Sequence, residues 1–191
     1  VDDGSRDTSL VIAQSYCQLH TECQVSAQEN RGVSAARNTA INAAKGVYIL
    51  PVDADDKISE TFIEKAINVI EKDKDIRMVG CRCWMFGAVD KEWRLPKFSH
   101  SLLARKNMIP ATTLYRKADW ERCGGYCEEE IYREDWDFWL SMMELGGTFY
   151  KLNEILFYYR ISTDSRRMLA KGRKKLIVDA INSRHPAYMQ K

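Results

Sequence analysis

Residues 47–56 read VYILPVDADD, an apolar run that ends in three closely spaced carboxylates. The apolar part, residues 47–52, is typical of a strand that is buried on both faces of a parallel sheet. Pro51 has no backbone N–H, so we expect it near the end of that strand. Ligands of open α/β sheets bind beyond the carboxyl ends of the strands. The stretch therefore predicts an α/β fold with a site just after residue 52.

The carboxylates of Asp53, Asp55 and Asp56 would repel one another in one loop unless a cation neutralised their charge. Oxygen ligands without a nearby His or Cys favour Mg²⁺ or Mn²⁺. The alternative is that these acids interact with the N-terminus of a helix predicted to begin at Ser59. A calcium-binding EF-hand loop is excluded, because Ile58 stands where that loop requires glycine. The loop thus predicts either a divalent-cation site or helix capping.

The hydrophobic pattern on both sides of this stretch alternates between helix and strand. We expect helices over residues 7–19, 34–45, 59–72, 135–145 and 168–182. We expect strands over residues 20–27, 47–52, 76–86, 112–115, 148–152 and 155–159, with 88–95 as a hairpin partner of 76–86. The alternation in the first half predicts a parallel sheet, and the mixed second half predicts antiparallel additions. No repeat or low-complexity linker divides the sequence, so we expect one domain over residues 1–191.

The composition excludes several classes of protein. With 29 Lys+Arg against 27 Asp+Glu, the chain lacks the basic excess of nucleic-acid-binding proteins, and we expect no nucleic-acid partner. No apolar run reaches the roughly 18 residues of a membrane-spanning helix. Six cysteines in 191 residues are too sparse for a disulfide scaffold, and they are not spaced as paired zinc knuckles. We therefore expect reduced thiols in a cytoplasmic protein.

Two more acidic clusters lie outside this loop. Residues 133–137, REDWD, begin the Trp-rich helix, where acids in the first turn ordinarily interact with the helix dipole. A carboxylate set among aromatic side chains would instead be a partly desolvated general base. Residues 1–5, VDDGS, are typical of the carboxyl end of a strand that enters a turn, and most of that strand would precede Val1. Three such clusters predict a common cleft.

Five segments, in order, resemble sequence elements of the family 2 glycosyltransferases. They are VDDGSRD at 1–7, NRGVSAARN at 30–38, AKGVYI at 44–49 with DADD at 53–56, GGY at 124–126 with EDWDFWL at 134–140, and Tyr159-Arg160 with Ser162 and Ser165. The similarity extends from residue 1 to about residue 167. It implies a GT-A fold, an α/β protein whose mixed, mainly parallel sheet is flanked by helices. The family's first strand, first helix and second strand would precede Val1. Where Ser162 stands the family often has His, so no additional metal ligand is expected there.

The resemblance also implies which residues bind the donor, a nucleotide-diphospho-sugar and usually a UDP-sugar. Asp2 and Asp3 would contact the nucleoside, Asp3 at the base, and Arg37 would lie beside the nucleotide. Asp53 would face the ribose, and Asp53 and Asp55 would hold the metal as the carboxylates of the family's DxD motif. The expected cofactor is Mg²⁺ or Mn²⁺.

On the acceptor side, the resemblance makes Asp135 the general base that deprotonates an acceptor hydroxyl, which then attacks the anomeric carbon with inversion. Glu134 would help to place the acceptor, a saccharide or a lipid-linked molecule. The implied function is a metal-assisted, inverting sugar transfer in cell-surface polysaccharide synthesis of a bacterial type. The alternative is a non-catalytic domain that binds sugar nucleotides or serves as a scaffold.

The same resemblance divides the domain into a nucleotide and metal half at 1–56, an acceptor half at 57–165 and a basic C-terminal helix at 166–191. Residues 166–175 hold six basic residues and no acidic one. Such a segment would contact the anionic inner face of a membrane, where lipid-linked acceptors reside, or form a solvated helix face. The expected location is the cytoplasm, with peripheral membrane contact as an option.

Overall fold

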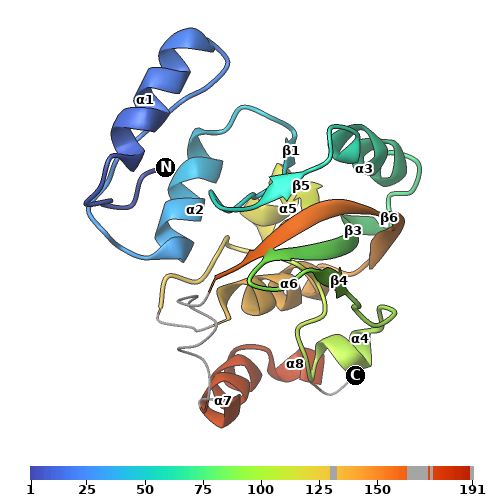
Figure 1. The fold of residues 1–191 in the computed structure, drawn as a ribbon. Helices are drawn as coiled ribbons and strands as arrows, with labels where there is room; N and C mark the ends of the chain where they lie inside the picture. Colours follow the sequence, from blue (N-terminus) through green and yellow to red (C-terminus); the bar gives the residue numbers. More distant parts are fainter. Residues whose placement is uncertain (130–132, 163–171, 173, 190–191) are drawn as a thin grey trace.

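The computed structural model describes residues 1–129, 133–162, 172 and 174–189. A mixed sheet runs through the molecule, and helices lie against it (Figure 1). The helices within the described ranges are α1 Ser9–Leu19, α2 Val33–Ala43, α3 Phe62–Ile70, α4 His100–Leu103, α5 Lys117–Arg122, α6 Glu134–Glu144, α7 Lys174–Arg184 and α8 Pro186–Met189. The strands are β1 Tyr48–Ile49, β2 Lys57–Ile58, β3 Ile76–Gly87, β4 Lys91–Trp93, β5 Leu114–Arg116 and β6 Thr148–Ile161.

The sheet has the strand order β1-β5-β3-β6-β2, with β4 paired to β3. The strands that follow α2, α3 and α6 are β1, β3 and β6, and they all run in the same direction, as the helix–strand alternation predicts. However, β5 lies between β1 and β3 and runs the opposite way. The mixed sheet is therefore confirmed, but its parallel part is the long pairing of β3 with β6, and the other four pairings are antiparallel.

The prediction of a strand over 47–52 buried on both faces is wrong. The observed β1 is short, and it lies at one end of the strand order, where only β5 pairs with it. An edge strand has less cover than a central one, and the side chain of Val47 is accordingly 70% exposed while Ile49 is buried. The strand ends before Pro51, as its missing N–H requires.

The N-terminal segment contains one correct and one wrong prediction. The helix expected over 7–19 is α1, but none of its residues is buried, and Figure 1 shows it standing away from the sheet. The strand expected over 20–27 is reduced to a single parallel bridge between Ala27 and Asp2. A strand needs a neighbouring backbone for its N–H and C=O groups, and in the described structure Asp2 is the residue that supplies them.

Two predicted element boundaries differ from the observed ones, because backbone groups form hydrogen bonds within the sheet. The helix expected to begin at Ser59 starts at Phe62, since the backbone N–H of Ser59 donates to the carbonyl of Leu156 in β6 and continues the sheet. The separate strands expected over 148–152 and 155–159 form one strand, β6. Its register against β3 slips between Leu152 and Ile155, so the predicted break is a β-bulge.

The other predicted elements agree with α2, α6, β3, β4 and β5 to within a few residues. The final helix was expected over 168–182. Its first residues lie outside the described ranges, and its described part is α7.

Hydrophobic cores form on both faces of the sheet. Met78 and Val79 are consecutive in β3, so their side chains point to opposite faces, and each belongs to a different buried cluster. One cluster contains a stripe of α6 whose side chains recur at helical spacing and are all buried: Trp136, Trp139, Leu140 and Met143. The other contains Phe62, Ala66 and Ile70 of α3. The two helices thus hold the long β3–β6 pair between them.

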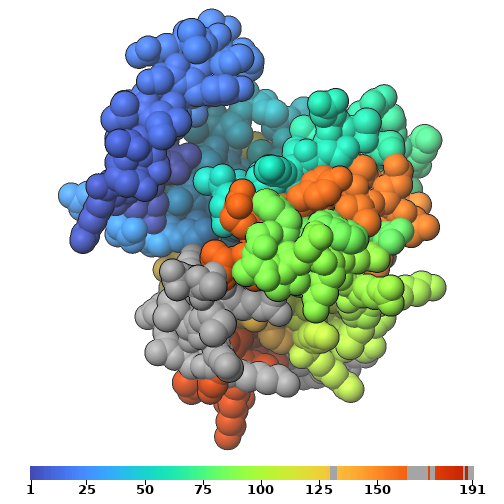
Figure 2. Space-filling model, in the orientation of Figure 1, coloured from blue at the N-terminus to red at the C-terminus, as the bar shows by residue number. Residues whose placement is uncertain are grey.

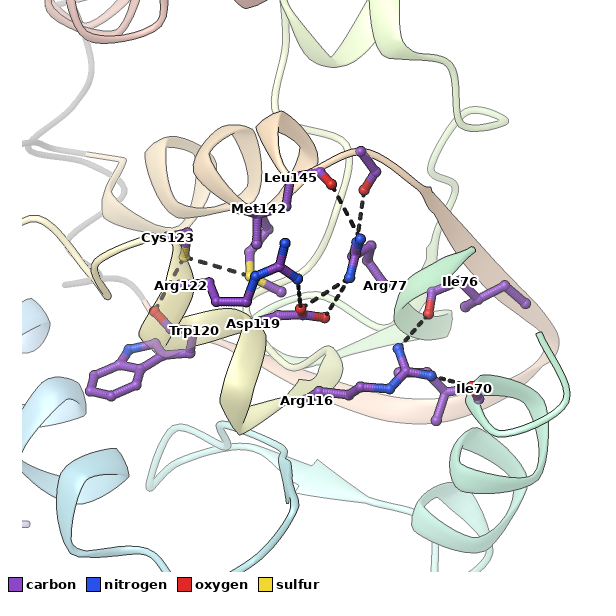
Figure 3. A network of polar contacts seen from close by, with 11 residues as sticks. Ile70, Ile76, Arg77, Arg116, Asp119, Trp120, Arg122, Cys123, Met142 and Leu145 are labelled. Carbon is purple, nitrogen blue, oxygen red and sulfur yellow. Dashed lines mark hydrogen bonds and ion pairs between the residues drawn. The ribbon is translucent and has the colours of Figure 1, made fainter. Parts of the chain in front are cut away.

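A largely buried ion pair joins β3 to α5 beside the C-terminal end of α6 (Figure 3). Nη1 of Arg77 in β3 donates to both carboxylate oxygens of Asp119 in α5, at 3.0 and 3.2 Å. The same guanidinium donates to the backbone carbonyls of Leu145 and Gly146, just after α6. Arg122 donates to Asp119 at 3.0 Å from the solvent side. This network fixes the C-terminal end of α6 relative to the sheet.

The buried side chain of His185, directly after α7, contacts two acidic residues of α6. Nε2 of His185 lies 3.0 Å from a carboxylate oxygen of Asp137, and its Nδ1 lies 3.0 Å from Glu144. Because both ring nitrogens face acceptors, the geometry favours the doubly protonated ring. Burial opposes that charge, but the hydrogen bonds to Asp137 and Glu144 outweigh it and raise the pKa of His185. Arg184 also donates to Asp137, at 2.8 Å.

We predict that this contact makes the protein less stable at alkaline pH. A histidine whose pKa is raised by folding contributes stability that is complete below the ordinary value of about 6.5 and is lost as the pH rises through the folded-state value. The free energy of unfolding, measured with urea at pH 6.0 and 8.5, is therefore expected to fall more in the wild type than in His185→Gln. His20→Gln, at a partly exposed histidine, is the control and should retain the wild-type fall. Equal falls in all three proteins would contradict the assignment.

The state of the cysteine thiols matches expectation. All six cysteines are free, as predicted. In the part of the chain that the structure describes, no helix is long and apolar enough to cross a membrane.

Candidate active site

The aspartate loop after β1, residues 53–56, is held at the end of β6. The backbone N–H of Arg160 donates to Oδ1 of Asp56 at 2.8 Å, and its Nε donates to the backbone carbonyl of Asp55 at 2.9 Å. The Arg160 guanidinium also lies 4.5 Å from the centre of the Phe86 ring. Arg160 belongs to the Tyr-Arg motif, but its role in holding this loop was not predicted.

Negative charge is crowded in this loop. Burial raises the pKa of Asp56 to about 6, and the charges of Asp53 and Asp55 act in the same direction against the hydrogen bond from Arg160. A nearby cation would relieve this repulsion. The repulsion among these carboxylates, from which the sequence analysis predicted a metal, is therefore present in the folded loop. The helix that the alternative invokes begins at Phe62 rather than at Ser59, so the acids precede its first turn by more residues than expected.

Arg37 joins the acidic clusters at 53–56 and 133–137. It projects from α2, with a side chain only 11% exposed, and its Nη2 donates to Asp53 at 2.8 Å. Its Nη1 donates to Glu134, the first residue of α6, at 3.1 Å. Burial alone would lower the pKa of Arg37, but Tyr126, Asp53 and Glu134 raise it above its ordinary value. Arg37 therefore brings the clusters at 53–56 and 133–137 together, which agrees with the prediction for two of the three clusters.

Asp135 lies in the first turn of α6, beside Glu134. Its Oδ1 accepts the backbone N–H of Trp136 at 2.9 Å, and its Oδ2 accepts Nδ2 of Asn107 at 2.7 Å. Burial raises the pKa of Asp135 to about 6, and the charge of Glu134 acts in the same direction. A base with a pKa just below neutrality is largely ionised at pH 7 and still has substantial proton affinity. Asn107 is the residue of this site that the sequence patterns missed.

The third cluster organises the turn before α2. Asp3 accepts hydrogen bonds from Nε2 of Gln28 and from the backbone N–H groups of Arg31 and Gly32, at 2.8 to 3.0 Å. These bonds outweigh the effect of burial and lower the pKa of Asp3. Asp2 accepts the backbone N–H of Ser5 at 3.1 Å. Within the described ranges, no hydrogen bond or ion pair links Asp2 or Asp3 directly to the other two clusters.

Instead, the turn is connected to the site through α2 and the glycine-rich loop. Asn38 donates to the carbonyl of Tyr126 at 2.8 Å and accepts its N–H at 2.9 Å. Arg31 forms an ion pair with Glu128 at 2.6 Å. Gly125 has a φ of +76°, and a Cβ there would lie 3.0 Å from Oδ1 of Asn38, so this position requires glycine. The motif at 30–38 thus docks on the motif at 124–126.

The surface is hollowed beside the aspartate loop. A hollow of about 620 Å³ lies between α1, residues 23–25 and Ala54, and Figure 2 shows the recess between α1 and the rest of the molecule. Tyr16 and Cys17 line its α1 side.

Comparison with known proteins assigns the chain to a family. The sequence profile described as "Glycosyl transferase family 2" matches residues 1–138, a range that contains all three acidic clusters. The chain belongs to glycosyl transferase family 2.

Three bacterial proteins are among its relatives in sequence. The putative teichuronic acid biosynthesis glycosyltransferase TuaG of Bacillus subtilis is 33% identical over 174 residues, covering 86% of this chain and 67% of TuaG. The uncharacterized glycosyltransferase EpsJ of the same organism is 29% identical, covering 86% of this chain and 52% of EpsJ. The chondroitin synthase of Escherichia coli is 26% identical, covering 82% of this chain and 23% of the synthase.

Solved structures place this family 2 chain in the GT-A fold. S. aureus TarS 1-349 in complex with UDP-GlcNAc has a TM-score of 0.74 at 19% identity, covering 96% of this chain and 55% of that one. The mannosyltransferase PcManGT from Pyrobaculum calidifontis in complex with GDP-Man and Mn²⁺ has a TM-score of 0.64 at 15% identity, covering 99% and 61%. The family 2 chain spans about half the length of several proteins that it resembles. The predicted fold class is confirmed.

Proposed function

We propose that this chain carries the donor-binding and catalytic core of an inverting glycosyltransferase that uses a UDP-sugar and a divalent metal in cell-surface polysaccharide synthesis. The observation that carries the proposal is a series of contacts. Asp135 lies beside Glu134, Glu134 accepts a hydrogen bond from Arg37, and Arg37 also donates to Asp53. This series of contacts connects a carboxylate with a pKa near 6 to a loop of crowded negative charge. Relatives named for chondroitin and teichuronic acid synthesis support the polysaccharide role.

The residues of the aspartate loop fit a divalent metal. No three His, Cys, Asp or Glu side chains among the described residues are grouped to hold a metal by themselves. Mg²⁺ and similar ions, however, are usually held by one or two carboxylates together with substrate phosphates. Asp55, exposed on the loop, and Asp53 would provide those carboxylates. A bound divalent cation would neutralise the charge that develops on the leaving diphosphate.

The proposed chemistry needs one proton acceptor from the protein. Asp135 takes the proton of the acceptor hydroxyl as the hydroxyl oxygen bonds to the anomeric carbon. The bond from that carbon to the diphosphate breaks, and its electron pair leaves with the diphosphate. Attack from the face opposite the leaving group inverts the configuration. Glu134, held by Arg37, lies next to the base and would position the acceptor saccharide or lipid-linked acceptor.

The donor is proposed to be a UDP-sugar because the TarS structure of the same fold binds UDP-GlcNAc. The GDP-Man complex of PcManGT makes a GDP-sugar the alternative. Asp2, Asp3 and Arg37 are proposed nucleotide contacts. Asp3 already accepts three hydrogen bonds, so it would contribute its remaining lone pair and the shape of its turn.

We retain the division into a nucleotide and metal half at 1–56 and an acceptor half at 57–165 as part of the proposal. Cytoplasmic location is proposed as well. The membrane contact suggested for residues 166–175 falls largely outside the described residues.

Calorimetric titration tests the donor part of the proposal. UDP is titrated into the chain with and without Mn²⁺, and GDP serves as the comparison. We expect Mn²⁺ to tighten UDP binding, and Asp55→Asn to remove that effect. Asp179→Asn, on the exposed side of α7, is the matched control and should behave as the wild type. Mn²⁺-independent affinity in the wild type would contradict the metal site. Tight UDP binding without sugar transfer to any saccharide acceptor would favour the alternative of a non-catalytic binding domain.

A further inference from the structure

We propose that Asn107 is a positioning residue that orients the Asp135 carboxylate and keeps it ionised for proton abstraction. The inference rests on the proposed role of Asp135 and adds a residue from outside the family motifs quoted above. Asn107 lies 28 positions before Asp135, in the segment between α4 and β5.

The direction of the contact follows from the groups around the Asn107 amide. Its Oδ1 accepts the backbone N–H of Ile109 at 3.2 Å, and its Nδ2 lies 2.7 Å from Oδ2 of Asp135. A backbone N–H is only a donor, so the amide oxygen must face Ile109. The NH₂ group must then face Asp135, where it donates to the carboxylate.

The segment that carries Asn107 is itself fixed to the same turn of α6. The indole Nε1 of Trp136 donates to the carbonyl of Leu103 at 2.7 Å, and this bond is buried. Met108 and Ile109, which follow Asn107, are also buried, at 3% and 1% exposure. Asn107 therefore lies between the Leu103 carbonyl bound by Trp136 and the buried Met108 and Ile109. Its amide meets the carboxylate of the residue directly before Trp136.

This arrangement leaves part of the carboxylate available for chemistry. Asp135 uses one lone pair of Oδ1 for the N–H of Trp136 and one lone pair of Oδ2 for Asn107. Two lone pairs remain for the proton of an acceptor hydroxyl. Burial and the charge of Glu134 favour the protonated form of Asp135, while the charges of Arg37 and Arg133 favour the ionised form. The hydrogen bond donated by Asn107 acts in the same direction as these two charges, and it is the one that also fixes the orientation of the carboxylate. Without Asn107, the base would rotate more freely and titrate at higher pH.

The test measures the titration of Asp135 directly. The carboxyl carbons of aspartate are labelled with ¹³C, and the Asp135 signal is identified by its loss in Asp135→Asn. In Asn107→Ala we expect the titration midpoint of Asp135 to move to higher pH by about 0.5 or more. In Asn107→Asp we expect a larger move, because a second carboxylate replaces the donor. Asn68→Ala, an exposed asparagine on α3, is the matched control and should leave the midpoint unchanged. An unchanged midpoint in both Asn107 variants would overturn the proposal.

Transfer kinetics provide a second measurement. With UDP-GlcNAc as donor, Asn107→Ala is expected to lower kcat roughly 10- to 100-fold, with little change in donor KM. In an Asp135→Asn background, the same substitution should have no further effect, since there is no base left to orient. A further loss in that background would overturn the positioning role. If Asp135→Asn is itself fully active, the proposed function fails, but the NMR midpoint still tests the Asn107–Asp135 contact.

Discussion

Replacing Asp135 with Asn is expected to lower the rate of sugar transfer roughly 100- to 10,000-fold, the usual contribution of a general base. The amide has the shape of the carboxylate but cannot take the proton of the acceptor hydroxyl. Nucleotide affinity should stay close to the wild-type value, because among the described residues the Asp135 side chain forms its hydrogen bonds with Asn107 and Trp136 and none with the aspartate loop. Transfer rate and calorimetric UDP affinity are measured on the same preparations.

The pH profile adds a second readout for Asp135. Since burial raises its pKa to about 6, kcat/KM of the wild type should fall as the pH drops below about 6. The sign follows from the ionised form being the active base. Asp179→Asn serves as the control, because Asp179 is exposed on α7. Near wild-type transfer by Asp135→Asn would remove this residue as the base.

Replacing Asp119 with Asn is expected to destabilise the fold by about 3 kcal/mol or more, because removing one partner of a buried ion pair leaves the other charge uncompensated. Asp119 is 3% exposed, and the side chain of Arg77 that it neutralises is 20% exposed. Asn is nearly isosteric, so the loss reflects charge and hydrogen bonding rather than a cavity. The measurement is the free energy of unfolding in urea.

Arg122→Gln provides the matched control for this prediction. Arg122 contacts the same carboxylate, but its side chain is 56% exposed, so its ion pair is screened by solvent. We expect its loss to cost less than about 1 kcal/mol. Equal destabilisation by the two substitutions would show that burial does not control the strength of this network.

The sequence predicted those parts of the fold that local patterns encode. The stripe of Trp136 and Trp139 identifies α6 because it repeats at helical spacing, and its burial follows from that pattern alone. The insertion of β5 between β1 and β3 has no such local signal. Strand order depends on which backbones meet after collapse, and so the predicted parallel neighbours of β1 were wrong.

The site divides in the same way. The acidic clusters at 53–56 and 133–137 stand at a strand end and a helix start, which is why their meeting could be predicted. Arg37 was named only through the family resemblance, as a residue beside the nucleotide, and the structure adds its bonds to both clusters. Asn107 carries no such signal, because it ends the polar run RKN at 105–107, before the buried pair Met108 and Ile109. Its importance comes from a partner 28 residues away, and only the folded chain brings the two together.

The strand order also bears on how this chain folds. Apart from the β3–β4 hairpin, every pairing in the sheet joins segments that are distant in sequence, and the central pairing joins Ile76–Gly87 to Thr148–Ile161. The entropy of closing these long loops must be lost before the contacts form, so folding should be slow compared with a helical protein of similar size. During synthesis, β3 has no parallel neighbour until β6 has left the ribosome. A product truncated before residue 148 would therefore lack the inner strand β6, and β2 at the edge would lose its partner as well.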